Sequence, residues 1–140
     1  MNNNWSSFCE YIINNYSSAS KIVEVGVGNI LEPSNILKEK MQDTQFNLVD
    51  IHPSTDEVIK EDIFKPTDSI YKNCNLIYSI RPPEELQKQI LYLADKHSCD
   101  CIIKPFFTED ITFKLKPRFK LINYKRDVFY LSKKKDEVIC

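Results

Sequence analysis

Glycine is almost absent from this chain of 140 residues, which contains only Gly26 and Gly28. A chain that makes its other turns without glycine has placed both residues where the backbone must bend sharply and where a ligand can approach the main chain. They follow an apolar run at residues 21–25. A Gly-x-Gly turn between a strand and a helix is typical of a cofactor site, because the first N–H groups of the helix point into the same crevice. The alternative is a tight turn that binds nothing, since a lone Gly-x-Gly is a weak signal.

Long apolar runs are absent too. No run approaches the roughly 20 residues that span a bilayer, and residues 1–5 lack the basic-then-apolar layout of a signal peptide. The length suits one domain, with no room for a separate substrate domain. We therefore expect a single cytoplasmic domain over residues 1–140 that does not interact with a membrane.

Cysteine is more frequent, but the number of residues, five, is odd, and none has the paired spacing of a zinc site. Cys99 and Cys101 form the only close pair in the sequence. Because alternate residues of a strand share a face, their thiols should point the same way. The pattern favours buried, inert thiols over a metal or redox role, so we expect no metal site.

Charge is nearly balanced, at −1, but unevenly distributed. Residues 1–109 hold 10 basic and 16 acidic side chains, whereas residues 110–140 hold 9 basic and 4 acidic ones. A basic C-terminal edge is formed by Lys114, Lys116, Arg118, Lys120, Lys125 and Arg126. This edge could meet the phosphates of a nucleic acid. We favour the alternative of a solubilising sheet edge, since lysine there discourages pairing with other chains.

Hydrophobic periodicity predicts the order of elements. An amphipathic helix is expected over about residues 5–17, with apolar residues three or four apart at Trp5, Phe8, Ile12 and Tyr16. Strands are predicted at 21–25, 46–49, 58–60, 76–80 and 101–104, and helices at 33–40 and 84–96. A basic hairpin follows at about 119–132, and a loose tail at 133–140.

The alternation of strands and helices predicts an α/β protein with a parallel sheet and right-handed crossovers. We expect a single-domain, Rossmann-like, doubly wound sheet of five parallel strands, with the strand at 21–25 central. The C-terminal hairpin should add an antiparallel edge.

Ligands of such sheets bind in the crevice at the carboxyl ends of the strands. The predicted strands bring together at that edge Glu24, Gly26, Gly28, Asp50, Asp62, Ser79 and Arg81. Asp50 lies 22 residues after Gly28, near the offset of about 20 at which a carboxylate accepts hydrogen bonds from ribose hydroxyls. An adenosine-containing small molecule is therefore the expected partner.

Ser79 and Arg81 are the candidate catalytic residues. The Arg81 guanidinium could hold a substrate phosphate or carboxylate bidentately, or neutralise the neighbouring acids, and we favour neutralisation. For Ser79 we favour a hydrogen bond to the main chain. His52 and His97 form no evident nucleophile-base set, and His97 should be a surface residue at a helix end. Residues 106–110 are a candidate lid over the crevice. Equally, Phe106 and Phe107 could fill the space in the short crossover to the next strand.

Two resemblances rest on these residues. Glu24-x-Gly26-x-Gly28, the acids after the next two strands and the terminal hairpin together resemble the core of class I S-adenosylmethionine-dependent methyltransferases. The segments 23–26, 77–84 (Ile-Tyr-Ser-Ile-Arg-Pro-Pro-Glu), 103–105, 109–111 and 121–124 resemble a small family of uncharacterised archaeal Rossmann-fold proteins. The methyltransferase resemblance implies that Gly26 and Gly28, with Glu24 nearby, hold the methionyl end, Asp50 the ribose and Asp62 the adenine amino group. It implies no role for Arg81.

The turn departs from both cofactor patterns. Ile30 stands where methyltransferases often have a third small residue, and Leu31 where the nicotinamide fingerprint requires glycine. That glycine permits close packing under a pyrophosphate, which S-adenosylmethionine lacks. S-adenosylmethionine is therefore the favoured cofactor and NAD the alternative.

These observations predict an adenosine-cofactor-binding protein whose leading reaction is S-adenosylmethionine-dependent methyl transfer. The alternative from another class is a non-catalytic nucleotide-binding or assembly module, favoured by the small size and the missing acid-base set. An NAD(P)-dependent oxidoreductase is a weaker hypothesis.

Overall fold

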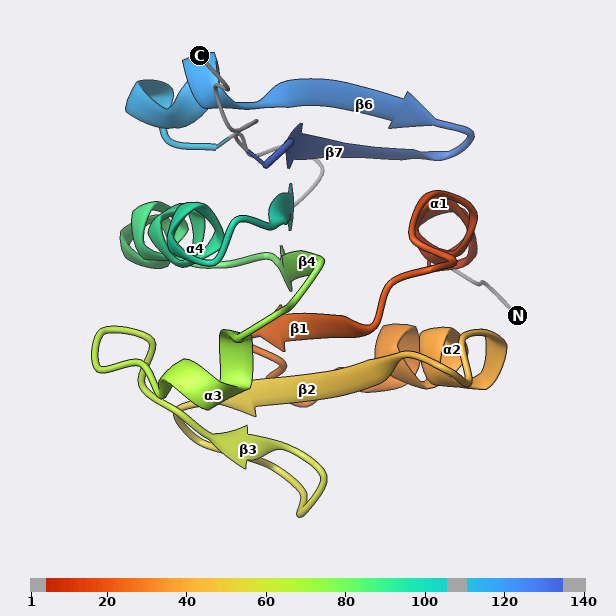
Figure 1. Ribbon diagram of the computed structural model, residues 1–140. Helices are drawn as coiled ribbons and strands as arrows, with labels where there is room; N and C mark the ends of the chain where they lie inside the picture. Colours follow the sequence, from red (N-terminus) through yellow and green to blue (C-terminus); the bar gives the residue numbers. More distant parts are fainter. Residues whose placement is uncertain (1–4, 106–110, 135–140) are drawn as a thin grey trace, which may run out of the picture.

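The computed structural model describes residues 5–105 and 111–134 (Figure 1). Its described part contains a seven-stranded sheet of order β3-β2-β1-β4-β5-β7-β6. The strands are β1 (Lys21–Val25), β2 (Gln45–Asp50), β3 (Ile59–Lys60), β4 (Leu76–Ile80), β5 (Asp100–Lys104), β6 (Lys120–Tyr124) and β7 (Asp127–Ser132). The helices are α1 (Ser6–Asn15), α2 (Glu32–Lys40), α3 (Asp68–Tyr71), α4 (Glu84–Lys96) and the 3₁₀ helix η1 (Phe113–Arg118).

The first five strands run parallel and the last two do not. β1 pairs with β2 and β4, β2 with β3, and β4 with β5, all in parallel. Val23 lies opposite Ile77 in this sheet. β7 pairs antiparallel with both β5 and β6. β7 therefore lies between them, and β6 is the edge strand of the sheet. The predicted fold is confirmed: a mostly parallel α/β sheet, with parallel neighbours on both sides of β1 and an antiparallel C-terminal hairpin.

Helices cover both faces of the sheet and make three layers (Figure 1). On one face, Phe8 of α1 and Leu37 of α2 pack in a cluster with Ile22. On the other face, Leu93 of α4 packs in a cluster with Val23. Neighbouring residues of β1 thus serve opposite cores, as the alternation of side chains along a strand requires. The carboxyl edge of the parallel strands lies between these two helix layers.

The predicted N-terminal helix forms and packs as its periodicity indicated. Trp5, Phe8, Ile12 and Tyr16 are all buried. α1 ends at Asn15, and the N–H of Tyr16 donates to the carbonyl of Ile12 at 2.8 Å. Burying each large apolar side chain contributes about 1.5–3 kcal/mol, so this stripe fixes the helix against the sheet.

Two short elements were not predicted from the sequence. α3 has four residues and lies between β3 and β4, and η1 precedes β6. Neither is long enough to show a helical repeat of apolar residues, which is the signal on which the prediction rested. β3 is also shorter than expected, with only two residues, both exposed.

The chain segment directly after β7 is held against the start of β5 by Asp100. Lys133 Nζ lies 3.2 Å from Asp100 Oδ2, and the N–H of Lys134 donates to Asp100 Oδ1 at 2.7 Å. The rest of the predicted tail, residues 135–140, and the candidate lid at 106–110 lie outside the described residues. Among the helices of the described residues, none is long and apolar enough to cross a bilayer.

Candidate functional site

The two glycines form an open turn between β1 and α2. Both have positive φ angles, 73° at Gly26 and 60° at Gly28, a backbone conformation that residues with a Cβ rarely adopt. The Gly26 N–H donates to the Val49 carbonyl at 2.9 Å, which ties the turn to β2. Around Gly28, a Cβ atom would meet nothing within 4 Å. The backbone conformation therefore explains both glycines, and the surface above Gly28 is open.

Asp50, the last residue of β2, is bonded directly to this turn. Its Oδ2 accepts the Gly28 N–H at 2.7 Å, and its Oδ1 accepts the His52 N–H at 2.8 Å. The side chain is half-buried. A carboxylate has about four acceptor positions, so each oxygen can still accept from a ligand hydroxyl. The sequence spacing placed Asp50 beside the turn, and the structure brings the two into contact.

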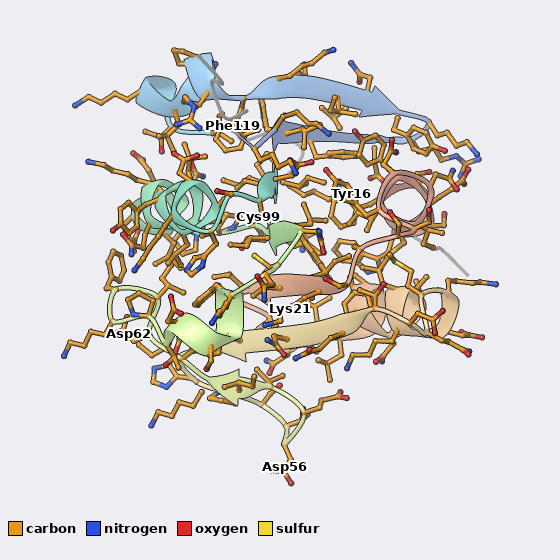
Figure 2. All side chains as sticks on the ribbon, in the orientation of Figure 1. Tyr16, Lys21, Asp56, Asp62, Cys99 and Phe119 are labelled. Atoms are coloured by element: carbon orange, nitrogen blue, oxygen red, sulfur yellow. The ribbon has the colours of Figure 1, made fainter. Side chains whose placement is uncertain are left out.

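The two acids after β3 have different surroundings. Glu61 is buried, and its carboxylate accepts hydrogen bonds from the Thr67 N–H at 2.9 Å and the Tyr71 hydroxyl at 3.1 Å. Asp62 is half-buried, and its carboxylate accepts the N–H of Phe64 at 3.0 Å. Glu61 therefore holds α3 in place, whereas Asp62 retains acceptor positions toward solvent (Figure 2).

Exposed apolar side chains lie next to Asp50 and Asp62 in the sequence. Ile51 directly follows Asp50 and is 50% exposed, and Phe64, two residues after Asp62, is 55% exposed. Large apolar side chains next to carboxylates at a strand end provide a surface for a flat aromatic ligand. The sequence interpretation did not include either residue, although their positions directly after the two acids could have suggested them.

Glu24, the acid before the turn, points away from the open edge. It is 1% exposed, and Oε1 accepts the hydroxyl of Tyr78, its neighbour on β4, at 2.8 Å. Burial raises the pKa of Glu24 to about 7, with a smaller opposing contribution from the Tyr78 hydrogen bond. The side chain lies in the layer beneath α1 and α2, where Tyr78 packs. Any contact of Glu24 with a ligand would require an opening of this layer.

Ser79 is also engaged by the fold. Its side chain is buried, and Oγ donates to the Val25 carbonyl at 2.7 Å. A Cβ at Gly26 would lie 3.8 Å from the same oxygen. The hydroxyl therefore links β4 to the main chain at the end of β1. This is the role that we favoured for Ser79 from the sequence.

Arg81 ends β4 in a strained backbone conformation. Its φ is 56°, in the left-handed region that a side chain disfavours, and its N–H donates to the Lys104 carbonyl at 2.6 Å. The side chain is exposed, and its guanidinium carbon lies 5.6 Å from the centroid of the Trp5 ring. Trp5 was predicted as a core residue only, since nothing in the sequence relates it to a position 76 residues away. The structure places a cation-aromatic pair at the carboxyl edge.

The other predicted candidates lie elsewhere. His97 does end α4, but the surface position predicted for it is wrong: its side chain is 9% exposed, and its ring stacks against Tyr71 at 5.6 Å between centroids. Burial lowers the pKa of His97. Within the described residues, no three metal-ligating side chains come together.

The basic C-terminal edge is partly neutralised by ion pairs. Arg118 binds Asp95 through two nitrogens, at 2.9 and 2.7 Å, and Lys125 Nζ lies 2.6 Å from Glu10 Oε2. Arg118 is thereby tied to α4, and Lys125 is tied to α1.

Comparison with known proteins shows relatives along almost the whole chain. The model of an uncharacterised protein family, UPF0146, matches residues 5–134. A UPF0146 protein of Methanothermobacter thermautotrophicus is 38% identical over 126 residues, covering 90% of this chain and 92% of its own. One from Pyrococcus horikoshii is 43% identical over 112 residues, covering 75% and 82%.

Solved structures with the same fold include several that are described as methyltransferases or as complexes with SAH. A putative caffeoyl-CoA O-methyltransferase from Staphylococcus aureus superposes with a TM-score of 0.63 at 11% identity, over 96% of this chain and 85% of that one. An S-adenosyl-L-methionine methyl transferase from Silicibacter pomeroyi gives 0.56 at 12% identity, over 92% and 91%. PigF, described with SAH, gives 0.63 at 9% identity, over 93% and 55%. At such identities the likeness shows a methyltransferase-like Rossmann fold.

Proposed function

We propose that this chain, which belongs to the uncharacterised protein family UPF0146, binds S-adenosylmethionine at the carboxyl edge of its sheet and transfers the methyl group. The observation that carries the proposal is the 2.7 Å hydrogen bond between the Gly28 N–H and Asp50 Oδ2. It joins the open glycine turn to a carboxylate that has acceptor positions left, as binding of a ribose beside a close-approach surface requires.

The surroundings suit the remaining parts of adenosine. Ile51 and Phe64 offer exposed apolar surface on which an adenine ring can pack. The Asp62 carboxylate, half-buried next to Phe64, can accept a hydrogen bond from the adenine amino group. The methionyl end would then extend along the turn at Gly26 and Gly28, both of which are exposed.

The charge of this edge supports S-adenosylmethionine over NAD. Glu32 lies in the first turn of α2, where its negative charge opposes the binding of a pyrophosphate at the helix N-terminus. Leu31, where the nicotinamide fingerprint requires glycine, packs against the cluster of Val27, Leu48 and Val58. A ligand with a cationic sulfonium and ammonium suits this acidic setting better than one with two phosphates.

Arg81 would receive the methyl acceptor. Its guanidinium can pair with a carboxylate or phosphate of that substrate. The buried Trp5 ring, 5.6 Å from the guanidinium carbon, would hold this cation in place. In the reaction the acceptor's lone pair forms a bond to the methyl carbon while the carbon–sulfur bond breaks, leaving neutral S-adenosylhomocysteine. The acceptor's proton passes to water. Such a transfer depends mainly on positioning, so it does not require a dedicated acid-base pair.

A non-catalytic adenosine-binding module is the second candidate. The observation that favours it is the Ser79 hydrogen bond to the Val25 carbonyl, which commits the hydroxyl at the end of β4 to the fold. His97, packed on Tyr71, likewise serves the structure.

Thermal unfolding in the presence of ligands tests the binding proposal. S-adenosylmethionine and S-adenosylhomocysteine should each raise the melting temperature, because a ligand at 100 times its dissociation constant stabilises by about 2.7 kcal/mol. NAD, NADP and ATP at the same concentrations should leave it unchanged. A shift with NAD and none with S-adenosylmethionine would reverse the assignment.

Formation of S-adenosylhomocysteine from S-adenosylmethionine, with a panel of carboxylate- and phosphate-bearing acceptors, tests catalysis. Arg81→Ala should abolish turnover while changing the affinity for S-adenosylmethionine by no more than a few fold, and Arg126→Ala on the hairpin is the matched control. Tight binding of S-adenosylmethionine without turnover on any acceptor would favour the non-catalytic module.

A further inference from the structure

Two cysteines far apart in the sequence meet at the amino edge of the sheet. The sulfur atoms of Cys74 and Cys99 lie 3.1 Å apart, within hydrogen-bonding contact, although 25 positions separate the residues. Both thiols are free and buried, at 4% and 2% exposure. Figure 2 shows Cys99 between the strands and α4. The pair belongs to the opposite edge from the adenosine site proposed above and does not depend on it.

The backbone fixes this contact from both sides. Each cysteine directly follows a residue in the left-handed conformation, Asn73 with φ 65° and Ser98 with φ 55°. The N–H of Asp100 donates to the Asn75 carbonyl at 3.2 Å, and Leu76 pairs with Asp100 at the start of the parallel ladder. Two sharp turns therefore place the thiols next to each other, directly before β4 and β5 begin.

We propose that Cys74 and Cys99 are a redox-active dithiol that closes to a disulfide when a peroxide oxidises it. The thiolate of one cysteine attacks a peroxide oxygen, the O–O bond breaks, and a sulfenic acid and one water form once a proton is taken up. The second thiol then attacks the sulfenic sulfur, so that the S–S bond forms and a second water leaves. The two sulfurs give up two electrons, and one hydrogen peroxide becomes two waters.

The required movement is small. A disulfide joins its sulfurs at about 2.05 Å, so the two atoms must approach by about 1 Å from the 3.1 Å observed here. The turns that carry them can supply this movement, because Lys72, Asn73, Asn75 and Ser98 are exposed. The same exposure lets a molecule as small as a peroxide reach the thiols through local opening of the turns.

The electrostatic surroundings separate Cys74 from the other described cysteines, since the pKa of its partner Cys99 is raised by the hydrogen bond between the two thiols and by burial. A hydrogen bond from the Cys99 thiol to a Cys74 thiolate, aided by the charge of Lys21, lowers the pKa of Cys74. Burial instead raises the pKa of Cys9 to about 12, and burial also raises that of Cys101. Since the thiolate is the reactive form, Cys74 should be oxidised first. Among the four cysteines that the structure describes, the inert character expected from the sequence is then kept for Cys9 and Cys101.

The disulfide would close a loop that carries the proposed acceptor site. Residues between Cys74 and Cys99 include β4, the end of β4 at Arg81, and the whole of α4. Cross-linking restricts the unfolded chain far more than the folded one. Oxidation should therefore raise thermal stability without requiring any ligand.

Treatment of the full-length reduced protein with a slight excess of hydrogen peroxide tests this. The wild type should lose two of its five thiols, measured by a thiol-reactive dye, and regain both with dithiothreitol. Peptide mapping without reductant should find the segments around Cys74 and Cys99 joined. The melting temperature should rise by about 5–15 °C on oxidation and return on reduction.

Single-residue variants complete the test. Cys101→Ala, a buried neighbour on the same face, should still lose two thiols, whereas Cys74→Ala should form no intramolecular disulfide. A wild type that keeps all five thiols, or a map that joins other cysteines, would overturn the proposal. If Cys74→Ala does not fold, the peptide map of the wild type still decides the question.

Discussion

The two edges of the parallel sheet use their acids differently. At the amino edge, the buried carboxylate of Asp100 accepts hydrogen bonds from the Tyr16 hydroxyl and the Lys134 N–H, both at 2.7 Å. It also forms an ion pair with Lys133 at 3.2 Å. At the carboxyl edge, half-buried Asp50 accepts two N–H groups of nearby turns and keeps contact with solvent. At the amino edge, the acceptor positions of the carboxylate are occupied by contacts that hold the fold together. The carboxyl edge holds its acid in place and leaves acceptors for a ligand.

The amino edge should be far more sensitive to the loss of its acid. Asp100→Ala leaves the buried Tyr16 hydroxyl without its acceptor and releases the segment after β7, so we expect a loss of about 3–4 kcal/mol in unfolding free energy. Asp50→Ala should lose about 1 kcal/mol, because water can replace its partners. Urea unfolding of both variants measures the difference. Equal losses would contradict the contrast between the edges.

Glu24 is the exception at the carboxyl edge, and its burial makes stability depend on pH. Its pKa in the folded protein is about 7, above an ordinary value near 4.5, so the folded state holds the proton more tightly. The contribution of protonated Glu24 to the free energy of unfolding is complete below pH 4.5. It declines as the pH rises through 7, by roughly 3 kcal/mol in all. In Glu24→Gln this decline should disappear from urea melts recorded between pH 5 and 8. A wild-type stability that rises over this range would contradict the assignment.

Asp50 should decide ligand binding more than it decides stability. Asp50→Asn keeps an acceptor for the turn but removes the charge, so the stabilisation by S-adenosylmethionine, about 2.7 kcal/mol at 100 times the dissociation constant, should fall by most of its value. Asp56→Asn is the matched control, because Asp56 is exposed and points away from the molecule (Figure 2). Equal ligand-induced shifts in wild type and Asp50→Asn would remove Asp50 from the site.

Arg81 offers the smallest and most specific test. Arg81→Ala loses the contact with Trp5 and keeps a strained φ, so we expect a loss of about 1 kcal/mol. Arg81→Gly loses the same contact but relieves the strain, and it should be close to wild type in stability. Both should lack methyl transfer. If Arg81→Gly is the less stable of the two, the backbone strain does not exist.

The fold could be predicted because its signals are local. Continuous apolar runs gave the parallel strands, and the three-to-four spacing gave α1 and α4. The candidate site residues Gly26, Gly28 and Asp50 could be placed together because the carboxyl ends of parallel strands meet at one edge. Short α3 and η1 gave no periodic signal and were missed.

Which side chains at an edge face outward was harder to predict, because this depends on register and on neighbouring layers. Glu24 and Asp62 were expected to serve the ligand alike, yet Glu24 bonds to Tyr78 inside the molecule and Asp62 does not. Glu61, next to Asp62, is buried against Tyr71. Glu61 and Asp62 follow β3 rather than lie in it, so strand alternation does not show which of the two neighbouring acids is buried and which is half-buried.

The sequence by itself determined where the glycine turn lies, which segments form strands and which face of the N-terminal helix is buried. These properties follow from backbone preferences and from the spacing of apolar side chains along one segment. Only the tertiary structure decided that Arg81 lies over Trp5 and that Cys74 meets Cys99. Those contacts join segments that share no local pattern, and they form because the sheet fixes the ends of β4 and β5 against each other and against α1.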